Sequence, residues 1–242
     1  RAMLGMGRED TPRETALIEA MIDASMDGLV LIAPRMEADV IADYARQIPI
    51  VAIGRHEPDT DAFATINSDD RRGAALAVEA FVRRGHEDIA MISSPLSMRN
   101  PGSVVSQREI GYREAMEAAG LAGRMRILRR PSAPEERDAY YRDLLSRPDR
   151  PGATFCWSDL DAIRLINVAR STGHTVPEEL AVIGYDNSST AALPLIDLAS
   201  IDQNGQRLGL LATGMLLSRI GDARTACRHV FVEPALVERG SL

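Results

Sequence analysis

The hydrophobic pattern of this chain alternates between helical spacing and short, unbroken apolar runs. Apolar positions three and four residues apart, as in Leu17, Ile18, Met21 and Ile22, indicate amphipathic helices. Continuous apolar runs between such segments indicate buried strands. The expected helices include residues 17–22, 40–44, 74–81, 116–119, 144–145 and 162–169, and the expected strands are 28–33, 50–53, 89–92, 125–128, 153–157 and 180–184. This alternation predicts an α/β fold with mostly parallel sheets that helices cover on both faces.

Glycines end several of the expected helices. Gly85, Gly120 and Gly173 stand where a left-handed C-terminal cap is expected, because glycine adopts positive φ without a steric penalty. The strands are too many for one compact doubly wound half, yet no Pro/Gly/Ser-rich linker separates two independent domains. The pattern therefore favours two lobes that share several crossovers.

Composition narrows the class of protein. A chain of 242 residues with 45% hydrophobic content can bury a substantial core. Its net charge of −7 opposes sequence-independent attraction to phosphates, so this chain alone is predicted to bind DNA poorly. Two cysteines without metal-ligand spacing favour a reduced compartment, and we see no membrane-spanning run and no secretory signal pattern. We expect a cytoplasmic protein without a membrane partner.

Candidate ligand contacts follow the ends of the expected strands. Parallel strands bring their carboxyl ends to one edge of a sheet, where open α/β folds bind small molecules. The candidate positions are 34–35, 54–55, 93–94, 157–159 and 185–187. Arg35 and Arg55 could contact a ligand there or be solvated loop cations. Trp157, the only tryptophan, could stack on a ligand, although a core position is the more common role.

Two charged residues are the strongest binding candidates. Arg108 starts an expected helix, and its planar guanidinium could reach two acceptors of one ligand; the alternative is a surface arginine. Asp186 follows the strand 180–184, and its carboxylate could accept hydrogen bonds from adjacent hydroxyls; the alternative is a loop or capping residue. We expect Asp159 to be the N-cap of the helix that follows it.

Catalytic and metal chemistry find little support in the sequence. The four histidines are scattered, and we find no nucleophile elbow, phosphate loop, zinc-ligand spacing or dinucleotide fingerprint. The sequence therefore predicts neither an enzyme nor a metal or cofactor site.

Four ordered segments carry a family resemblance. Residues 69–92, 107–112, 176–187 and 233–241 together resemble the effector-binding and dimerisation core of lactose-repressor (LacI/GalR) family transcription regulators. The resemblance implies a type I periplasmic-binding-protein-like fold of two Rossmann-like lobes joined by three crossovers. It implies an N-terminal lobe of residues 1–67 and 204–225 and a C-terminal lobe of residues 68–203 and 226–242. It also implies that a first strand, a helix and a helix-turn-helix headpiece precede this sequence.

The same resemblance implies which residues contact the ligand. Arg108 matches the arginine of the family's Arg-x-x-Gly-aromatic motif, and Asp186 and Gln203 match further effector contacts. Ser158 stands where many relatives have asparagine, and its shorter side chain leaves that contact open. The stacking aromatic expected after residues 125–128 is not evident, so stacking would come from Tyr140 or Tyr141 or be absent.

The resemblance implies a homodimeric regulator. A small polar effector (a sugar, sugar phosphate or nucleoside) would bind between the lobes and alter operator DNA binding by the headpiece. The alternative is a periplasmic sugar-binding receptor of a transporter, which shares the architecture. The absence of a signal pattern, the Arg-Arg-Gly-His phrase at residues 83–86 and the ending at 236–241 favour the regulator. Upstream sequence would distinguish the two.

Overall fold

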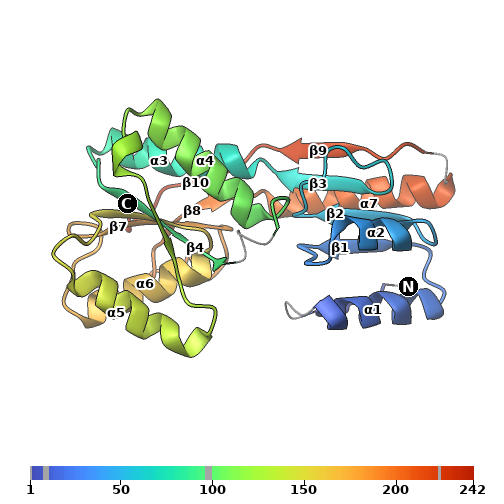
Figure 1. The fold of residues 1–242 in the computed structure, drawn as a ribbon, viewed down its shortest axis with the longest axis horizontal. Helices are drawn as coiled ribbons and strands as arrows, with labels where there is room; N and C mark the ends of the chain where they lie inside the picture. The colour runs from blue at the N-terminus through green and yellow to red at the C-terminus, as the bar shows by residue number, and fades with distance from the viewer. Residues whose placement is uncertain (1, 8–10, 96–99, 223–224) are drawn as a thin grey trace. The chain divides into compact units, whose positions relative to one another are not determined.

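The computed structural model describes residues 2–7, 11–95, 100–222 and 225–242. The chain divides into two compact units (Figure 1). Unit 1 comprises Arg1–Ser68, Gly102–Val104 and Gly205–Val232, and unit 2 comprises Asp69–Pro101, Val105–Asn204 and Glu233–Leu242. Each unit has its own sheet and its own hydrophobic core.

Unit 1 contains a parallel sheet of order β1-β2-β3-β9. Its strands are β1 (Leu29–Ile32), β2 (Ile50–Ile53), β3 (Ala64–Ser68) and β9 (His229–Val232), and its helices are α1 (Thr11–Asp23), α2 (Ala38–Ala45) and α7 (Gly205–Gly221). Successive residues of a strand face opposite sides of the sheet. Ile50 accordingly packs in the core that includes Ile18 of α1 and Ile41 of α2, whereas Val51 packs with Leu208 of α7.

Unit 2 contains the larger sheet, of order β10-β8-β7-β6-β4-β5, in which only the β10–β8 pair is antiparallel. Its strands are β4 (Ile89–Ser93), β5 (Arg126–Arg129), β6 (Ala153–Cys156), β7 (Ala181–Tyr185), β8 (Ala199–Asp202) and β10 (Ala235–Val237). Its helices are α3 (Asp70–Arg83), α4 (Val104–Ala118), α5 (Arg137–Ser146) and α6 (Asp159–Ser171), with short 3-10 turns η2 (Ala122–Arg124) and η3 (Pro134–Glu136).

Helices cover both faces of the unit 2 sheet. Figure 1 shows α3 and α4 on one face and α5 and α6 on the other. Ile183 of β7 packs in the first core and Val182 in the second, so every residue of β7 is buried. This burial explains the continuous apolar run that predicted the strand.

The predicted α/β class, its mostly parallel sheets and its type I periplasmic-binding-protein-like architecture are confirmed. The predicted glycine caps are also confirmed, with φ angles of 83° at Gly85, 74° at Gly120 and 85° at Gly173. After Gly85, the His86 N–H donates to the Phe81 carbonyl at 3.1 Å and satisfies one of the last acceptors of α3.

The last crossover lies later in the chain than expected. The prediction assigned residues 226–242 to the C-terminal lobe. The structure keeps the chain in unit 1 through Val232, because β9 pairs in parallel with β3, with Thr65 opposite His229 and Ile66 opposite Val230. The chain enters unit 2 for the last time at Glu233.

No helix among the described residues is both long enough and apolar enough to cross a lipid bilayer.

Candidate ligand-binding site

Arg108, Trp157, Asp186 and Gln203 come together at the carboxyl edge of the unit 2 sheet. They belong to α4 and to the segments that follow β6, β7 and β8, which are neighbouring parallel strands. Arg108 Nη1 donates to the Trp157 carbonyl at 2.5 Å and lies 3.9 Å from Asp186 Oδ1. Gln203 Nε2 donates to the same Asp186 oxygen at 2.6 Å. We call these four residues, with Asp70 and Tyr185, the carboxyl-edge cluster.

Arg108 is an interior residue of this cluster rather than a surface arginine. It is only 2% exposed, and its Nε donates to Oδ1 of the fully buried Asp70 at 2.7 Å. Its Cζ lies 3.5 Å from the centroid of the Tyr185 ring, a cation–π contact. Burial acts to lower the pKa of Arg108, but the surrounding Asp70, Tyr185 and Asp186 together outweigh it and the pKa lies above its usual value. The guanidinium therefore stays charged.

Asp186 lies on a strained turn. Its φ is 113° and that of Asn187 is 46°, a region that non-glycine residues rarely adopt. Its side chain remains 38% exposed. Partial burial raises the pKa of Asp186 to about 6, while the nearby Arg108 charge opposes the rise. Strained backbone and a shifted carboxyl pKa are both frequent at functional sites.

The helix that follows β6 is capped by Ser158, so the assignment of Asp159 as its N-cap is wrong. Ser158 Oγ accepts the Asp161 N–H at 3.4 Å. Asp159 is buried instead, and its carboxylate accepts hydrogen bonds from Ser200 Oγ at 2.6 Å and from the Ser188 N–H at 2.7 Å. Burial raises the pKa of Asp159, and these hydrogen bonds oppose the rise. Asp159 thus ties the segment after Asp186 to β8, whereas the Ser158 hydroxyl is engaged in capping.

A buried charged network beside the cluster was not predicted from the sequence. Arg130, which follows β5, donates from Nε to Asp161 Oδ2 at 2.9 Å. The Trp157 indole Nε1 donates to the same oxygen at 2.7 Å, and the Tyr141 hydroxyl donates to Oδ1 at 2.9 Å. This network fixes the Trp157 ring. Tyr141 is buried in the core, which contradicts its suggested role as a stacking ring, and burial raises the pKa of its hydroxyl.

The position of Asp161 in the helical pattern of α6 could have indicated this network. Asp161 lies one position before Ala162 and four before Leu165, so it shares the buried face of α6 with Leu165. A carboxylate on the apolar face of a helix requires a buried partner. Arg130, in the stretch where no stacking aromatic was evident, supplies it.

Arg35 and Arg55 belong to unit 1. Arg55 is 2% exposed, and it forms an ion pair with Glu57 at 2.7 Å and donates from Nη1 to the Met36 carbonyl at 3.0 Å. It is therefore not a solvated loop cation. The backbone N–H of Arg35 donates to Glu14 at 3.0 Å, which ties this loop to α1. Neither residue is part of the carboxyl-edge cluster, whose members all lie in unit 2.

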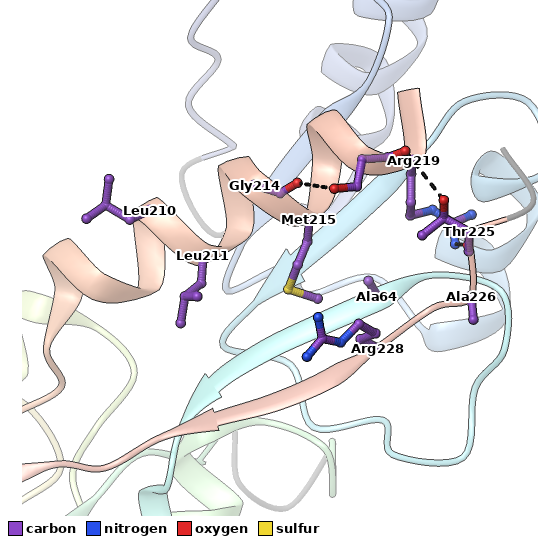
Figure 2. Close-up of a pocket in the computed structure, with 10 residues that line it drawn as sticks. Ala64, Leu210, Leu211, Gly214, Met215, Arg219, Thr225, Ala226 and Arg228 are labelled. Carbon is purple, nitrogen blue, oxygen red and sulfur yellow. Dashed lines mark hydrogen bonds between the residues drawn. The ribbon is translucent and has the colours of Figure 1, made fainter. Parts of the chain in front are cut away.

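Unit 1 also contains a groove of about 330 Å³ between α7 and the starts of β3 and β9 (Figure 2). Leu210, Leu211 and Met215 of α7 give it an apolar wall. Arg219, at its far end, donates from Nη1 to the Thr225 carbonyl at 3.1 Å and contacts Cys227 Sγ at 2.6 Å. None of the predicted ligand contacts lines this groove.

Comparison with known proteins identifies the family. Residues 78–242 match the family described as a periplasmic binding protein-like domain. The chain is 31% identical over 234 residues to the HTH-type transcriptional repressor PurR of Photorhabdus laumondii, covering 95% of this chain and 67% of that protein. A solved LacI-family regulatory protein from Chloroflexus aggregans has 30% identity and a TM-score of 0.80, covering 96% of this chain and 83% of that one. The regulator CelR in complex with cellobiose has 26% identity and a TM-score of 0.82, covering 99% and 73%.

These matches extend over nearly the whole chain, and the relatives named in them are transcriptional regulators rather than enzymes. The chain belongs to the lactose-repressor (LacI) family and forms its periplasmic-binding-protein-like, ligand-sensing core.

Proposed function

We propose that the carboxyl-edge cluster of unit 2 binds a neutral, hydroxyl-rich ligand, and that this ligand controls operator binding by a helix-turn-helix headpiece. The observation that supports this most directly is the approach of Arg108 and Gln203, from separate elements, to the same Asp186 oxygen, at 3.9 Å and 2.6 Å. Together they offer a carboxylate acceptor beside guanidinium and amide donors. Adjacent hydroxyls of a sugar can donate to the carboxylate and accept from its neighbours.

Charge favours a neutral ligand over a phosphorylated one. Carboxylates outnumber guanidinium groups in and around the cluster: Asp70, Asp159, Asp161, Asp186 and Asp202 face Arg108, Arg130 and Arg239. Arg108 and Arg130 are already paired with Asp70 and Asp161, so neither is a free anion receptor. A phosphate would meet a net negative field. The CelR structure contains cellobiose, a neutral sugar, which supports this choice among sugars, sugar phosphates and nucleosides.

The names of the chain's relatives favour a transcription regulator over a transport receptor. PurR of Photorhabdus laumondii is named a transcriptional repressor, and its identity extends over 95% of this chain. A repressor works on operator DNA, so we propose a cytoplasmic location. Two-fold symmetric operators are read by dimers, so we also propose a homodimer.

A thermal-shift panel tests the ligand class. We expect cellobiose or D-ribose to raise the melting temperature and expect glucose 6-phosphate to leave it unchanged. A ligand at 100 times its dissociation constant adds about 2.7 kcal/mol, which corresponds to about 5–10 °C for a protein of this size. A shift produced by the phosphorylated sugar alone would contradict the proposed class.

A further inference from the structure

Two consecutive non-glycine residues with positive φ need specific support from their surroundings. Asp186 and Asn187 adopt φ angles of 113° and 46°, and each would relax if its contacts were lost. The Asp186 side chain accepts a hydrogen bond from Gln203, and its backbone N–H donates to the Ile201 carbonyl at 2.9 Å. The neighbouring Asn187 is held by more contacts.

Asn187 is held at three points. Its backbone N–H donates to Ser200 Oγ at 2.9 Å, and its Nδ2 donates to Asp202 Oδ2 at 3.3 Å. Its Oδ1 accepts from Arg239 Nη2 at 2.6 Å. The carboxamide thus uses both its donor and its acceptor, a combination that aspartate and leucine lack.

Arg239 is well placed to hold this carboxamide. Its Nη1 donates to the Leu198 carbonyl at 2.6 Å, so the guanidinium joins the start of β8 to the strained turn. The planar fork fixes both bonds at once, which a lysine cannot do.

The end of the chain fixes Arg239 in turn. Ser241 is 1% exposed; its Oγ accepts the Ala199 N–H at 2.9 Å and donates to the Val182 carbonyl at 2.7 Å. Gly240 lies so close to Asp197 that an added Cβ would stand 2.3 Å from Asp197 Oδ2. The segment after β10 is therefore locked against β7 and β8, and Arg239 has little freedom to point elsewhere.

We propose that Arg239 is a positioning residue for the ligand site: by holding the Asn187 carboxamide it fixes the turn that presents Asp186 to the ligand. This inference rests on the proposed role of Asp186 in ligand binding. The same network reaches Gln203, because Asp202 Oδ2 accepts from Asn187 while its Oδ1 accepts the Asn204 N–H at 2.7 Å. Arg239 therefore acts on both polar ligand contacts without touching either.

The test uses Arg239→Met with Arg84→Met as its matched control. Arg84 also contacts the C-terminal segment, through Glu238 at 3.0 Å, but it does not contact the strained turn. The first readout, amide hydrogen exchange, needs no ligand. We expect the Asn187 and Ser188 amides of Arg239→Met to exchange about 10-fold faster or more, the effect of losing a hydrogen bond to a charged group. The Trp157 amide, which donates to Ile92, should keep its rate in both variants.

The second readout is the dissociation constant for cellobiose and for D-ribose. We expect Arg239→Met to weaken binding about 10–100-fold, again the range for a hydrogen bond to a charged group, and Arg84→Met to bind like the wild type. Asn187→Ala keeps the Arg239–Leu198 bond and should match Arg239→Met. The double variant should lose less than the sum of the two single losses, because both variants remove the Arg239–Asn187 contact.

Each outcome decides the matter. Unchanged exchange at Asn187 in Arg239→Met overturns the proposal whatever the ligand is. Faster exchange with unchanged sugar affinity, or additive losses in the double variant, also overturns the positioning role. The wild type could also bind neither sugar while Arg239→Met exchanges faster. That result would contradict the proposed function, and it would overturn the inference because Arg239 would then only anchor the turn.

Discussion

At the scale of single residues, Asp186 combines two properties that a ligand-binding carboxylate needs. It is exposed enough to meet a ligand, at 38% of its side chain, yet it stands 3.9 Å from a guanidinium that is buried and permanently charged. Partial burial is the main cause that raises its pKa to about 6; the Arg108 charge opposes this rise, and the nearby Asp159 and Asp70 add to it. The carboxylate is therefore ionised at neutral pH but not far below it.

This pKa predicts a pH dependence with a definite sign. Because the folded pKa lies above the usual 3.8, the folded state binds the proton more tightly, and this contribution to stability falls as pH rises from about 4 to about 6. Ligand affinity should change in the opposite direction, because hydroxyls donate to the ionised form. We expect about 10-fold weaker sugar binding at pH 5 than at pH 7.5, because at pH 5 Asp186 is ionised in only about a tenth of the molecules. Asp186→Asn should remove this pH dependence. A wild-type sugar affinity that is the same at pH 5 and pH 7.5 would refute the prediction.

Residue-level prediction from sequence selected Arg108, Trp157, Asp186 and Gln203 from position or resemblance, and the structure brings these four together. Arg35 and Arg55, which were selected from strand ends, lie in unit 1 instead. Prediction did less well where the outcome depended on a partner distant in the sequence. The bonds of Asp159 to Ser188 and Ser200 could not be inferred from local capping preference, which is why the neighbouring Ser158 was overlooked as the cap.

At the scale of elements, the sequence predicted six strands from runs rich in apolar residues. These strands are β1, β2, β4, β5, β6 and β7, and each was located to within about one residue at its ends. β3, with the sequence A-T-I-N-S, and β8, with A-S-I-D, were not identified as strands because polar residues interrupt their apolar runs. β9 was also missed, because its pairing with β3 joins residues that are far apart in the sequence. As a result, the predicted lobe boundary was placed too early in the chain.

The Arg130–Asp161 network joins several elements of unit 2, and its loss should be costly. Asp161→Ala leaves the buried Arg130 without its partner and removes an acceptor from Trp157 and Tyr141. We expect a loss of about 3–5 kcal/mol in the free energy of unfolding, measured by chemical denaturation followed by circular dichroism. Asp138→Ala is the control, because it removes an exposed pair with Arg164 and should cost no more than about 1 kcal/mol. Equal losses in the two variants would show that the network contributes little.

At the scale of the whole molecule, the chain is a ligand-sensing core whose relatives are longer. It covers 67–70% of the PurR repressors it matches. Its net charge of −7 agrees with a core that leaves DNA contact to another part of the protein. A regulator of this kind requires a ligand site, a DNA-binding element and a way of presenting two copies of that element to an operator.

The proposed homodimer has a candidate surface on unit 2. Leu195 is 89% exposed and Leu193, two residues before it in the same segment, is 52% exposed. Large apolar side chains exposed in one segment are candidates for an interface. We expect the chain to sediment as a dimer at micromolar concentration and Leu195→Asp to shift it to monomer. Leu217→Asp, at a 61% exposed position on α7 of unit 1, is the control. A wild type that sediments as a monomer would contradict the proposal.

The most direct measurement is a fluorescence titration at Trp157, the only tryptophan of the chain and a member of the carboxyl-edge cluster. The titrant is the neutral sugar that gives the largest thermal shift, and the proteins are the wild type, Asp186→Ala and Asp149→Ala, the last at a 78% exposed carboxylate outside the cluster. We predict saturable binding by the wild type and by Asp149→Ala and at least about 10-fold weaker binding by Asp186→Ala, the cost of losing hydrogen bonds to a charged group. Equal affinity in all three proteins would contradict the assignment of the ligand site.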